Sequence, residues 1–140
     1  MTQRSLEQER AANALTRVQE LAERNREDKF RSCYRSYVDR FAPSVLMMGL
    51  GQALATERAA AGAKPKKEDQ RAHDELYKSL QQWLCRQDGG VYPGAHDLLE
   101  ALSEGSEDQY LLAQAEALAW LQWHKKFCRA EFHGEGGPED

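Results

Sequence analysis

The chain has 140 residues, of which 41% are hydrophobic and 30% are charged, and its formal net charge is −4 at pH 7. This length suits one domain that buries about two thirds of its unfolded surface without disulfides or metal. No run of about 18 apolar residues is present, which excludes a membrane-spanning helix. Four glutamates among the first 25 residues argue against a secretory or transit peptide, so we expect a soluble, cytoplasmic protein.

The first two predicted helices each carry one apolar face. Residues 6 to 25 place alanine, leucine and valine at the i, i+3, i+4, i+7 spacing of an amphipathic helix, and Ser5 suits its amino-terminal cap. A second helix, from about Glu27 to Arg40, brings aromatic and cysteine side chains to one side: Phe30, Cys33, Tyr34, Tyr37 and Phe41. Both helices are therefore expected to pack through one face.

The third predicted helix is apolar all the way round. Residues 43 to 55 read Pro-Ser-Val-Leu-Met-Met-Gly-Leu-Gly-Gln-Ala-Leu-Ala, which leaves no polar side on a helical wheel. A helix of this kind has to be buried. Pro43 suits its first position, where the missing N–H costs nothing. We therefore predict a central helix from Pro43 to about Ala60 that is nearly inaccessible to water and ends before Gly62 and Pro65.

The remaining segments complete an all-α pattern. Residues 66 to 87 predict a fourth helix that is stopped by Asp88-Gly89-Gly90, and residues 97 to 102 predict a short one. The fourth helix carries an apolar core face: Leu76, Tyr77, Leu80, Trp83 and Leu84. Ser106 suits the cap of a last helix that reaches about Phe132, and residues 134 to 140 form an acidic tail that we expect to be disordered. The class is all-α: a compact bundle of about five or six helices around a buried central helix, in a single domain over residues 1 to 133.

The cysteines and histidines do not predict a catalytic, metal or cofactor site. The three cysteines lack a C-x-x-C spacing and indicate small buried or half-buried hydrophobes: Cys33, Cys85 and Cys128. His124 and Cys128 lie one turn apart, which suits a thiolate–imidazole pair, but no third group orients them and a packed core pair is favoured. His73 and His96 are each followed by an aspartate whose side chain diverges on a helix, which makes a poor metal site.

Basic residues are unevenly distributed along the chain. Residues 1 to 88 carry 16 basic and 13 acidic side chains, whereas residues 89 to 140 carry 3 and 10. In the first helix, Arg10, Arg17 and Arg24 recur every seven residues, and Arg31 and Arg35 extend the basic charge into the second. This pattern fits a solvated face with salt bridges to nearby glutamates. It also fits a ridge of guanidinium groups that contacts phosphates.

The three basic residues of the acidic third lie together on the last helix. Lys125 and Arg129 are one turn apart, and Lys126 shares a face with Arg129. The helix dipole favours cations near a carboxyl end, which is a structural explanation. Beside Trp123, the same cations suit the binding of RNA phosphates while the indole stacks on a base or a partner, and we favour this functional interpretation slightly.

Two segments resemble a known family. Residues 49 to 55, Gly-Leu-Gly-Gln-Ala-Leu-Ala, resemble a central motif of the small helical subunit of the type III-B CRISPR (Cmr) effector complex. Residues 116 to 127 are similar to its aromatic closing helix, and Lys125 and Lys126 match its basic pair by position. Helix order and chain length agree, so the resemblance covers roughly residues 5 to 132.

The resemblance implies a non-enzymatic subunit of an RNA-guided machine that targets foreign RNA. Such a subunit would pack against further copies of itself and a large signalling subunit, with its basic flank along single-stranded guide and target RNA. The alternative is a stand-alone helical adaptor without RNA binding, which would bind a partner protein through aromatic side chains: Tyr34, Tyr37, Trp83 or Trp123. Salt-sensitive RNA binding separates the two. A small hydrolase or redox protein using His124 and Cys128 is a third interpretation.

Overall fold

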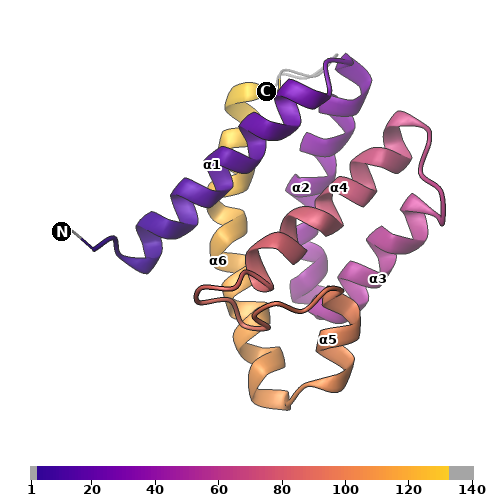
Figure 1. Cartoon of the computed structure of the whole chain (residues 1–140). Helices are drawn as coiled ribbons and strands as arrows, with labels where there is room; N and C mark the ends of the chain where they lie inside the picture. The colour runs from indigo at the N-terminus through magenta and orange to yellow at the C-terminus, as the bar shows by residue number, and fades with distance from the viewer. Residues whose placement is uncertain (1–2, 133–140) are drawn as a thin grey trace.

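The computed structural model describes residues 3–132 and confirms the all-α class. Within these residues it contains helices and no strand. The six helices are α1 (Leu6–Arg24), α2 (Asp28–Met48), α3 (Leu50–Ala61), α4 (Glu68–Leu84), α5 (Leu98–Glu104) and α6 (Glu107–Glu131). Their arrangement is a bundle in which α6 runs upward from α5 to the end of α1 (Figure 1). The predicted acidic tail, residues 134 to 140, lies outside the described residues.

The helix starts confirm the predicted caps. The Ser5 hydroxyl accepts a hydrogen bond from the Gln8 backbone N–H at 3.1 Å, and the Gln8 side chain accepts one from the Ser5 N–H at 2.8 Å. Ser106 and Gln109 make the same reciprocal pair at the start of α6. These reciprocal pairs are capping boxes, and they satisfy backbone N–H groups that a helix start leaves without partners. Both helix starts are therefore set by residues close together in the sequence.

The predicted start of a central helix at Pro43 is wrong, because α2 continues through Pro43 to Met48. The chain breaks instead at Gly49, whose φ of +88° is a conformation that glycine adopts without strain. Two side chains of α6 satisfy the backbone donors that the break frees. The Leu50 N–H donates to Gln114 Oε1 at 2.9 Å, and the Gly51 N–H donates to the Tyr110 hydroxyl at 2.8 Å.

The prediction that residues 43 to 60 are nearly inaccessible to water is also wrong. Val45, Leu50 and Leu54 are buried, but Leu46 is 74% exposed and Met47 is 87% exposed. The break at Gly49 explains the difference, since α2 and α3 each turn one face inward and leave the other in solvent. The absence of a polar side on the helical wheel of residues 43 to 55 therefore does not mean that this segment is buried.

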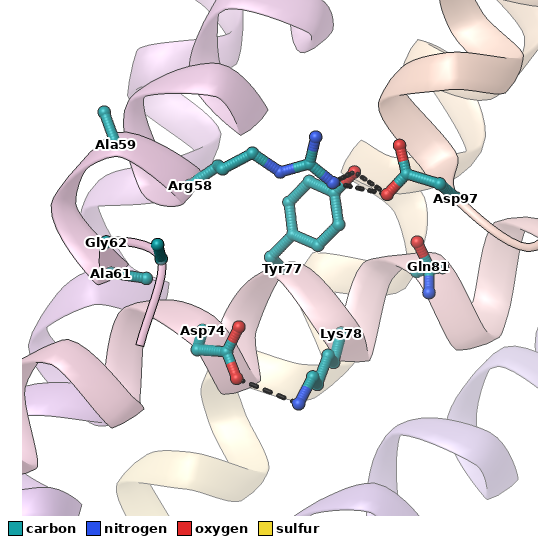
Figure 2. Close-up of a pocket in the computed structure, with 10 residues that line it drawn as sticks. Arg58, Ala59, Ala61, Gly62, Asp74, Tyr77, Lys78, Gln81 and Asp97 are labelled. Atoms are coloured by element: carbon teal, nitrogen blue, oxygen red, sulfur yellow. Dashed lines mark hydrogen bonds and ion pairs between the residues drawn. The ribbon is translucent and has the colours of Figure 1, made fainter. Parts of the chain in front are cut away.

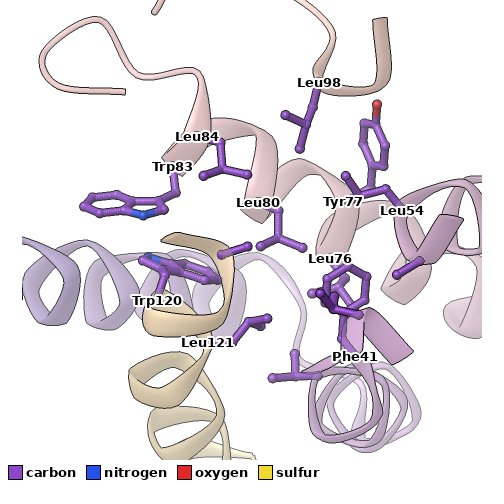
Figure 3. Close-up of a cluster of buried hydrophobic side chains, with 14 of the residues drawn as sticks. Phe41, Leu54, Leu76, Tyr77, Leu80, Trp83, Leu84, Leu98, Trp120 and Leu121 are labelled. Atoms are coloured by element: carbon purple, nitrogen blue, oxygen red, sulfur yellow. The ribbon is translucent and has the colours of Figure 1, made fainter. Parts of the chain in front are cut away.

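The core lies between α2, α4 and α6. α2 packs against α3, α4 and α6, while α1 packs mainly on α6. α4 supplies the apolar face that its spacing predicted, and Figure 3 shows its side chains meeting those of α2, α3 and α6: Leu76, Leu80, Trp83 and Leu84 from α4, Phe41 from α2, Leu54 from α3, and Trp120 and Leu121 from α6. The cysteines also lie as predicted, with Cys85 and Cys128 buried and Cys33 half-buried.

Candidate nucleic-acid interface

The seven-residue arginine repeat of α1 does not form a surface ridge, because its middle member points into the fold. Arg17 is only 3% exposed. Its Nε donates to Ser79 Oγ at 2.6 Å, and its Nη2 donates to Glu75 Oε1 at 2.7 Å. A buried guanidinium needs such partners, since an unpaired charge in the interior is strongly destabilising. Arg17 is thus removed from the predicted RNA contacts by burial.

The two ends of the repeat differ in exposure. Arg10 makes a bidentate ion pair with the buried Glu116, with donor–acceptor distances of 2.7 and 2.8 Å. Burial alone would raise the pKa of Glu116, but hydrogen bonds from Arg10 and the Trp83 indole outweigh burial and lower the pKa. Arg24 has a 55% exposed side chain and makes only a 3.4 Å contact with Glu75. Of the three, Arg24 alone faces mainly solvent.

Arg31 and Arg35 act as helix caps. The Arg31 side chain donates to the backbone carbonyls of Asn25 at 2.8 Å and Ala22 at 2.7 Å, at the carboxyl end of α1. Arg35 donates to the carbonyl of Phe132 at 3.0 Å, at the end of α6. Helix ends leave these carbonyls without partners, so the arginines supply donors that the backbone lacks. Their charge is committed to internal structure.

The basic residues of α6 are more accessible than most of the arginines of α1 and α2. We call Lys125, Lys126 and Arg129 the basic cluster. Lys126 and Arg129 are exposed and Lys125 is half-buried. Arg129 makes a 3.3 Å ion pair with Asp39 of α2, while neither lysine pairs with a carboxylate among residues 3–132. The structure therefore brings three cations together on one exposed stretch of helix, as their spacing predicts.

The aromatic residues considered for partner binding divide in the same way. Tyr34 is fully buried and Trp83 is 2% exposed, which removes both from any surface contact. Tyr37 is half-buried and stacks on His73, with 3.8 Å between ring centroids. Trp123 is half-buried beside the basic cluster, and its indole N–H donates to Glu7 Oε2 at 3.1 Å. Of these four aromatic residues, only Tyr37 and Trp123 are partly exposed.

His124 belongs to a buried chain of hydrogen bonds that the sequence did not reveal. Its Nε2 lies 2.7 Å from the Tyr34 hydroxyl, which lies 2.8 Å from Ser79 Oγ, the acceptor of the Arg17 Nε bond. Its Nδ1 lies 3.2 Å from the carbonyl oxygen of Ala14, which assigns the imidazole proton to Nδ1. This chain joins α1, α2, α4 and α6 through groups in contact but far apart in sequence.

Burial sets the protonation of His124 and Cys128. Burial lowers the pKa of His124 to about 3 and raises the pKa of the Cys128 thiol. Both side chains are fully buried, which confirms the predicted packed core pair. At neutral pH the imidazole is therefore neutral and the sulfur carries its proton.

A surface groove lies where α3, α4 and the start of α5 meet, and Figure 2 shows its lining. Its volume is about 590 Å³. Arg58 stacks on the Tyr77 ring, with its guanidinium carbon 4.6 Å from the centroid, and bonds both the Tyr77 hydroxyl and Asp97 Oδ1. Lys78 pairs with Asp74 at 2.9 Å. Each cation of the groove is thus neutralised by a neighbouring carboxylate.

The part of the chain that the structure describes contains neither a candidate metal site nor a candidate membrane-spanning helix. No group of three or more histidine, cysteine, aspartate or glutamate side chains is arranged to hold a metal ion there. Among the same residues, no helix combines the length and the apolarity that crossing a membrane requires.

Comparisons with known proteins identify the family. The family model for the CRISPR-associated protein Cas_Cmr5 matches residues 6–131. The fold is similar to the crystal structure of a CRISPR-associated Cmr5 family protein from Thermus thermophilus, with a TM-score of 0.66 and 30% sequence identity. The match covers 92% of this chain and 98% of that chain. The chain therefore belongs to the Cmr5 family, the small helical subunits of type III-B CRISPR (Cmr) effector complexes.

Proposed function

We propose that this subunit binds single-stranded RNA through its basic cluster and has no catalytic activity of its own. In the effector complex it would pack with like subunits along guide and target RNA. Family membership supports the setting, and the accessible cations of α6 are the observation that carries the RNA contact. A cytoplasmic location, where the complex would meet foreign RNA, is part of the same proposal.

The basic cluster has the properties that phosphate binding requires. Its two lysines have no carboxylate partner among the described residues, so their charge is available to a ligand. Binding a polyanion depends on the local potential, which a net charge of −4 over the whole chain does not describe. Phosphate contacts of this kind carry no base information, so the affinity should be independent of sequence.

Arg24 is the one further arginine that we include, because its side chain is largely exposed. The other predicted contacts are left out of the proposed interface, since their guanidinium groups hold internal partners: Arg10, Arg17, Arg31 and Arg35. The proposed surface is therefore smaller than the sequence suggested and centres on α6.

A role without catalysis is supported by the state of the reactive side chains. A neutral imidazole without solvent access and a protonated buried thiol are poorly placed to attack RNA. We propose that RNA cleavage by the complex belongs to partner subunits, and that this chain contributes binding and packing.

The test is RNA binding by a charge-reversed pair with a matched control. Lys125→Glu with Lys126→Glu removes two proposed contacts, whereas Lys64→Glu with Lys66→Glu makes the same charge change at exposed positions outside the interface. The first variant should lose most of its RNA affinity, and the second should keep it apart from a general electrostatic loss. Neutralising one contacting cation should reduce the slope of log affinity against log salt by about 0.7. Equal losses in the two variants would contradict the interface.

A further inference from the structure

Arg129 is the one member of the basic cluster that has an ion-pair partner among residues 3–132. Its Nη2 lies 3.3 Å from Oδ1 of Asp39 in α2, and its side chain is 54% exposed. Lys125 and Lys126 have no carboxylate within ion-pair distance in the same part of the chain. An RNA phosphate at the basic cluster therefore meets two free cations and a third that already holds an anion.

Asp39 depends on Arg129 for the compensation of its charge. Its side chain is 30% exposed, but its Oδ1 atom is buried and accepts no hydrogen bond within the described residues. The two nearest arginines along α2 are engaged elsewhere, since Arg35 donates to the carboxyl end of α6 and Arg40 stacks on the Tyr37 ring. A buried carboxylate oxygen without a cation or a hydrogen bond is costly. Asp39 therefore favours conformations in which the Arg129 guanidinium stays beside α2.

The Asp39 carboxylate faces α6. Cys128 precedes Arg129 in α6, and the pKa of its thiol is raised mainly by burial and further by the negative charge of Asp39. The 3.3 Å contact between Asp39 and Arg129 has the same direction. A phosphate that reached the Arg129 guanidinium would thus come close to a second anion. Like charges repel, and partial burial weakens the screening of that repulsion by salt.

We propose that Asp39 limits RNA binding by competing with RNA phosphates for the guanidinium group of Arg129. When a phosphate takes the guanidinium, the buried Oδ1 of Asp39 loses its cation. When both anions share the guanidinium, they repel each other. In either case part of the free energy of the arginine–phosphate contact is lost, whereas Lys125 and Lys126 have no such competitor. RNA is therefore held mainly by the two lysines, and Arg129 mainly links α6 to α2.

This role of Asp39 deepens the proposed function, because it regulates the RNA contact of the basic cluster and rests on that contact. It also distinguishes cations that helical spacing alone treats as equal. Removing the Asp39 charge should add a third phosphate contact without changing any cation.

The first experiment compares two carboxylate-to-amide variants by fluorescence anisotropy with a labelled oligouridylate. Asp39→Asn keeps the size of the side chain and frees Arg129. Glu131→Gln is the matched control, because Glu131 is exposed on α6, two residues after Arg129. Asp39→Asn should raise the RNA affinity about fivefold, within the range that double-mutant cycles measure for residues in contact. It should also steepen the slope of log affinity against log salt by about 0.7, the value for one more phosphate contact on a single strand.

The control variant should behave differently. Glu131→Gln should give a smaller, general electrostatic gain with an unchanged slope. Equal gains in the two variants would overturn the competition. A loss of affinity in Asp39→Asn would overturn it as well, since that result would mean that Asp39 orients Arg129 toward the phosphate. Thermal unfolding checks that both variants are folded at the temperature of the binding measurement.

The second experiment removes Arg129 itself. In the chain with Asp39 intact, Arg129→Ala should leave the salt slope nearly unchanged, whereas Lys126→Ala should reduce it by about 0.7. In the Asp39→Asn background, Arg129→Ala should abolish the gain in affinity beyond that of the control. A gain that persists without Arg129, or equal slope changes in the two alanine variants, would overturn the competition. The comparison of the alanine variants does not require Asp39→Asn to fold.

Binding of inorganic polyphosphate separates a failure of this proposal from a failure of the proposed RNA contact. Polyphosphate presents phosphates without bases or ribose, so Asp39→Asn should bind it more tightly than Glu131→Gln does. A chain that shows this difference but binds no oligouridylate would overturn only the RNA contact. A chain that binds oligouridylate through Lys125 and Lys126, with equal affinities in the two amide variants, would overturn only the competition. A chain that binds neither polyanion would overturn both.

Discussion

The arginines of α1 and α2 and the basic cluster of α6 have similar sequence patterns but different environments. Arg17 is buried against Ser79 and Glu75, and Arg10 holds Glu116, so these cations connect helices. Lys125 and Lys126 lie on an exposed stretch without carboxylate partners among residues 3–132. Helical spacing brings cations to one side in both regions. The packing of the neighbouring helices decides whether that side faces carboxylates or solvent.

The largest expected effect comes from removing a buried cation. Arg17→Ala leaves the Glu75 carboxylate and the Ser79 hydroxyl without their main partner, and breaking a buried pair in this way should destabilise the fold by about 3 kcal/mol. Arg24→Ala, seven residues along the same helix but exposed, should change the stability by less than about 0.5 kcal/mol. Urea unfolding of both variants measures the difference. Similar losses of unfolding free energy in the two variants would show that the buried arginine contributes no more to stability than the exposed one.

A second large effect should appear on acidification, through the neutral His124 of the same buried chain. The folded-state pKa of about 3 lies below the unfolded value of about 6.5. The unfolded chain therefore binds a proton that the folded chain does not. The stabilisation is fully present above pH 6.5 and falls by about 1.4 kcal/mol per pH unit as the pH drops toward 3.

Unfolding free energies at pH 7 and pH 5 should thus differ by about 2 kcal/mol through His124 alone. His124→Gln removes the titrating group and provides the control. The variant should be less stable at pH 7 but should lose less stability on acidification. A wild-type curve that is flat between pH 7 and pH 5 would mean that the fold does not lower the pKa of His124, as for an exposed imidazole.

The cations of the basic cluster should affect binding but not folding. Lys125→Ala with Lys126→Ala should leave the unfolding free energy within about 0.5 kcal/mol of the wild type, because neither side chain has an internal ion pair to lose. The affinity for single-stranded RNA should fall by several-fold in fluorescence anisotropy. A clear loss of stability with unchanged RNA binding would show that the α6 lysines, like Arg10 and Arg17, stabilise the fold and do not bind RNA.

The smallest expected effect is on RNA cleavage. Labelled RNA incubated with the purified chain and Mg²⁺ or Mn²⁺ should stay intact on a gel, and His96→Ala, at an exposed position, should change nothing. Cleavage that copurifies with the chain and is lost in this variant would show that the surface supports chemistry as well as binding.

Much of this protein could be predicted from its sequence because the signals are local. Capping boxes at Ser5 and Ser106 set two helix starts, and the apolar spacing of residues 76 to 84 set the core face of α4. Resemblance of residues 49–55 and 116–127 to the Cmr small subunit indicated the family that the comparisons then showed. The grouping of Lys125 and Arg129 also followed from helical spacing alone.

Two features depended on the tertiary structure alone. One is whether the side chains on one face of a helix point into the core or into solvent, and the other is where α2 ends. Arg17 is buried because Glu75 and Ser79, about 60 residues later, meet it across the bundle. The chain breaks at Gly49 and not before Pro43 because Tyr110 and Gln114 of α6 satisfy the amides that the break frees. Periodicity records which side chains share a face, whereas burial depends on what packs against that face. For the same reason, the sequence determined that residues 43–55 are apolar, and only the fold determined that Leu46 and Met47 lie in solvent.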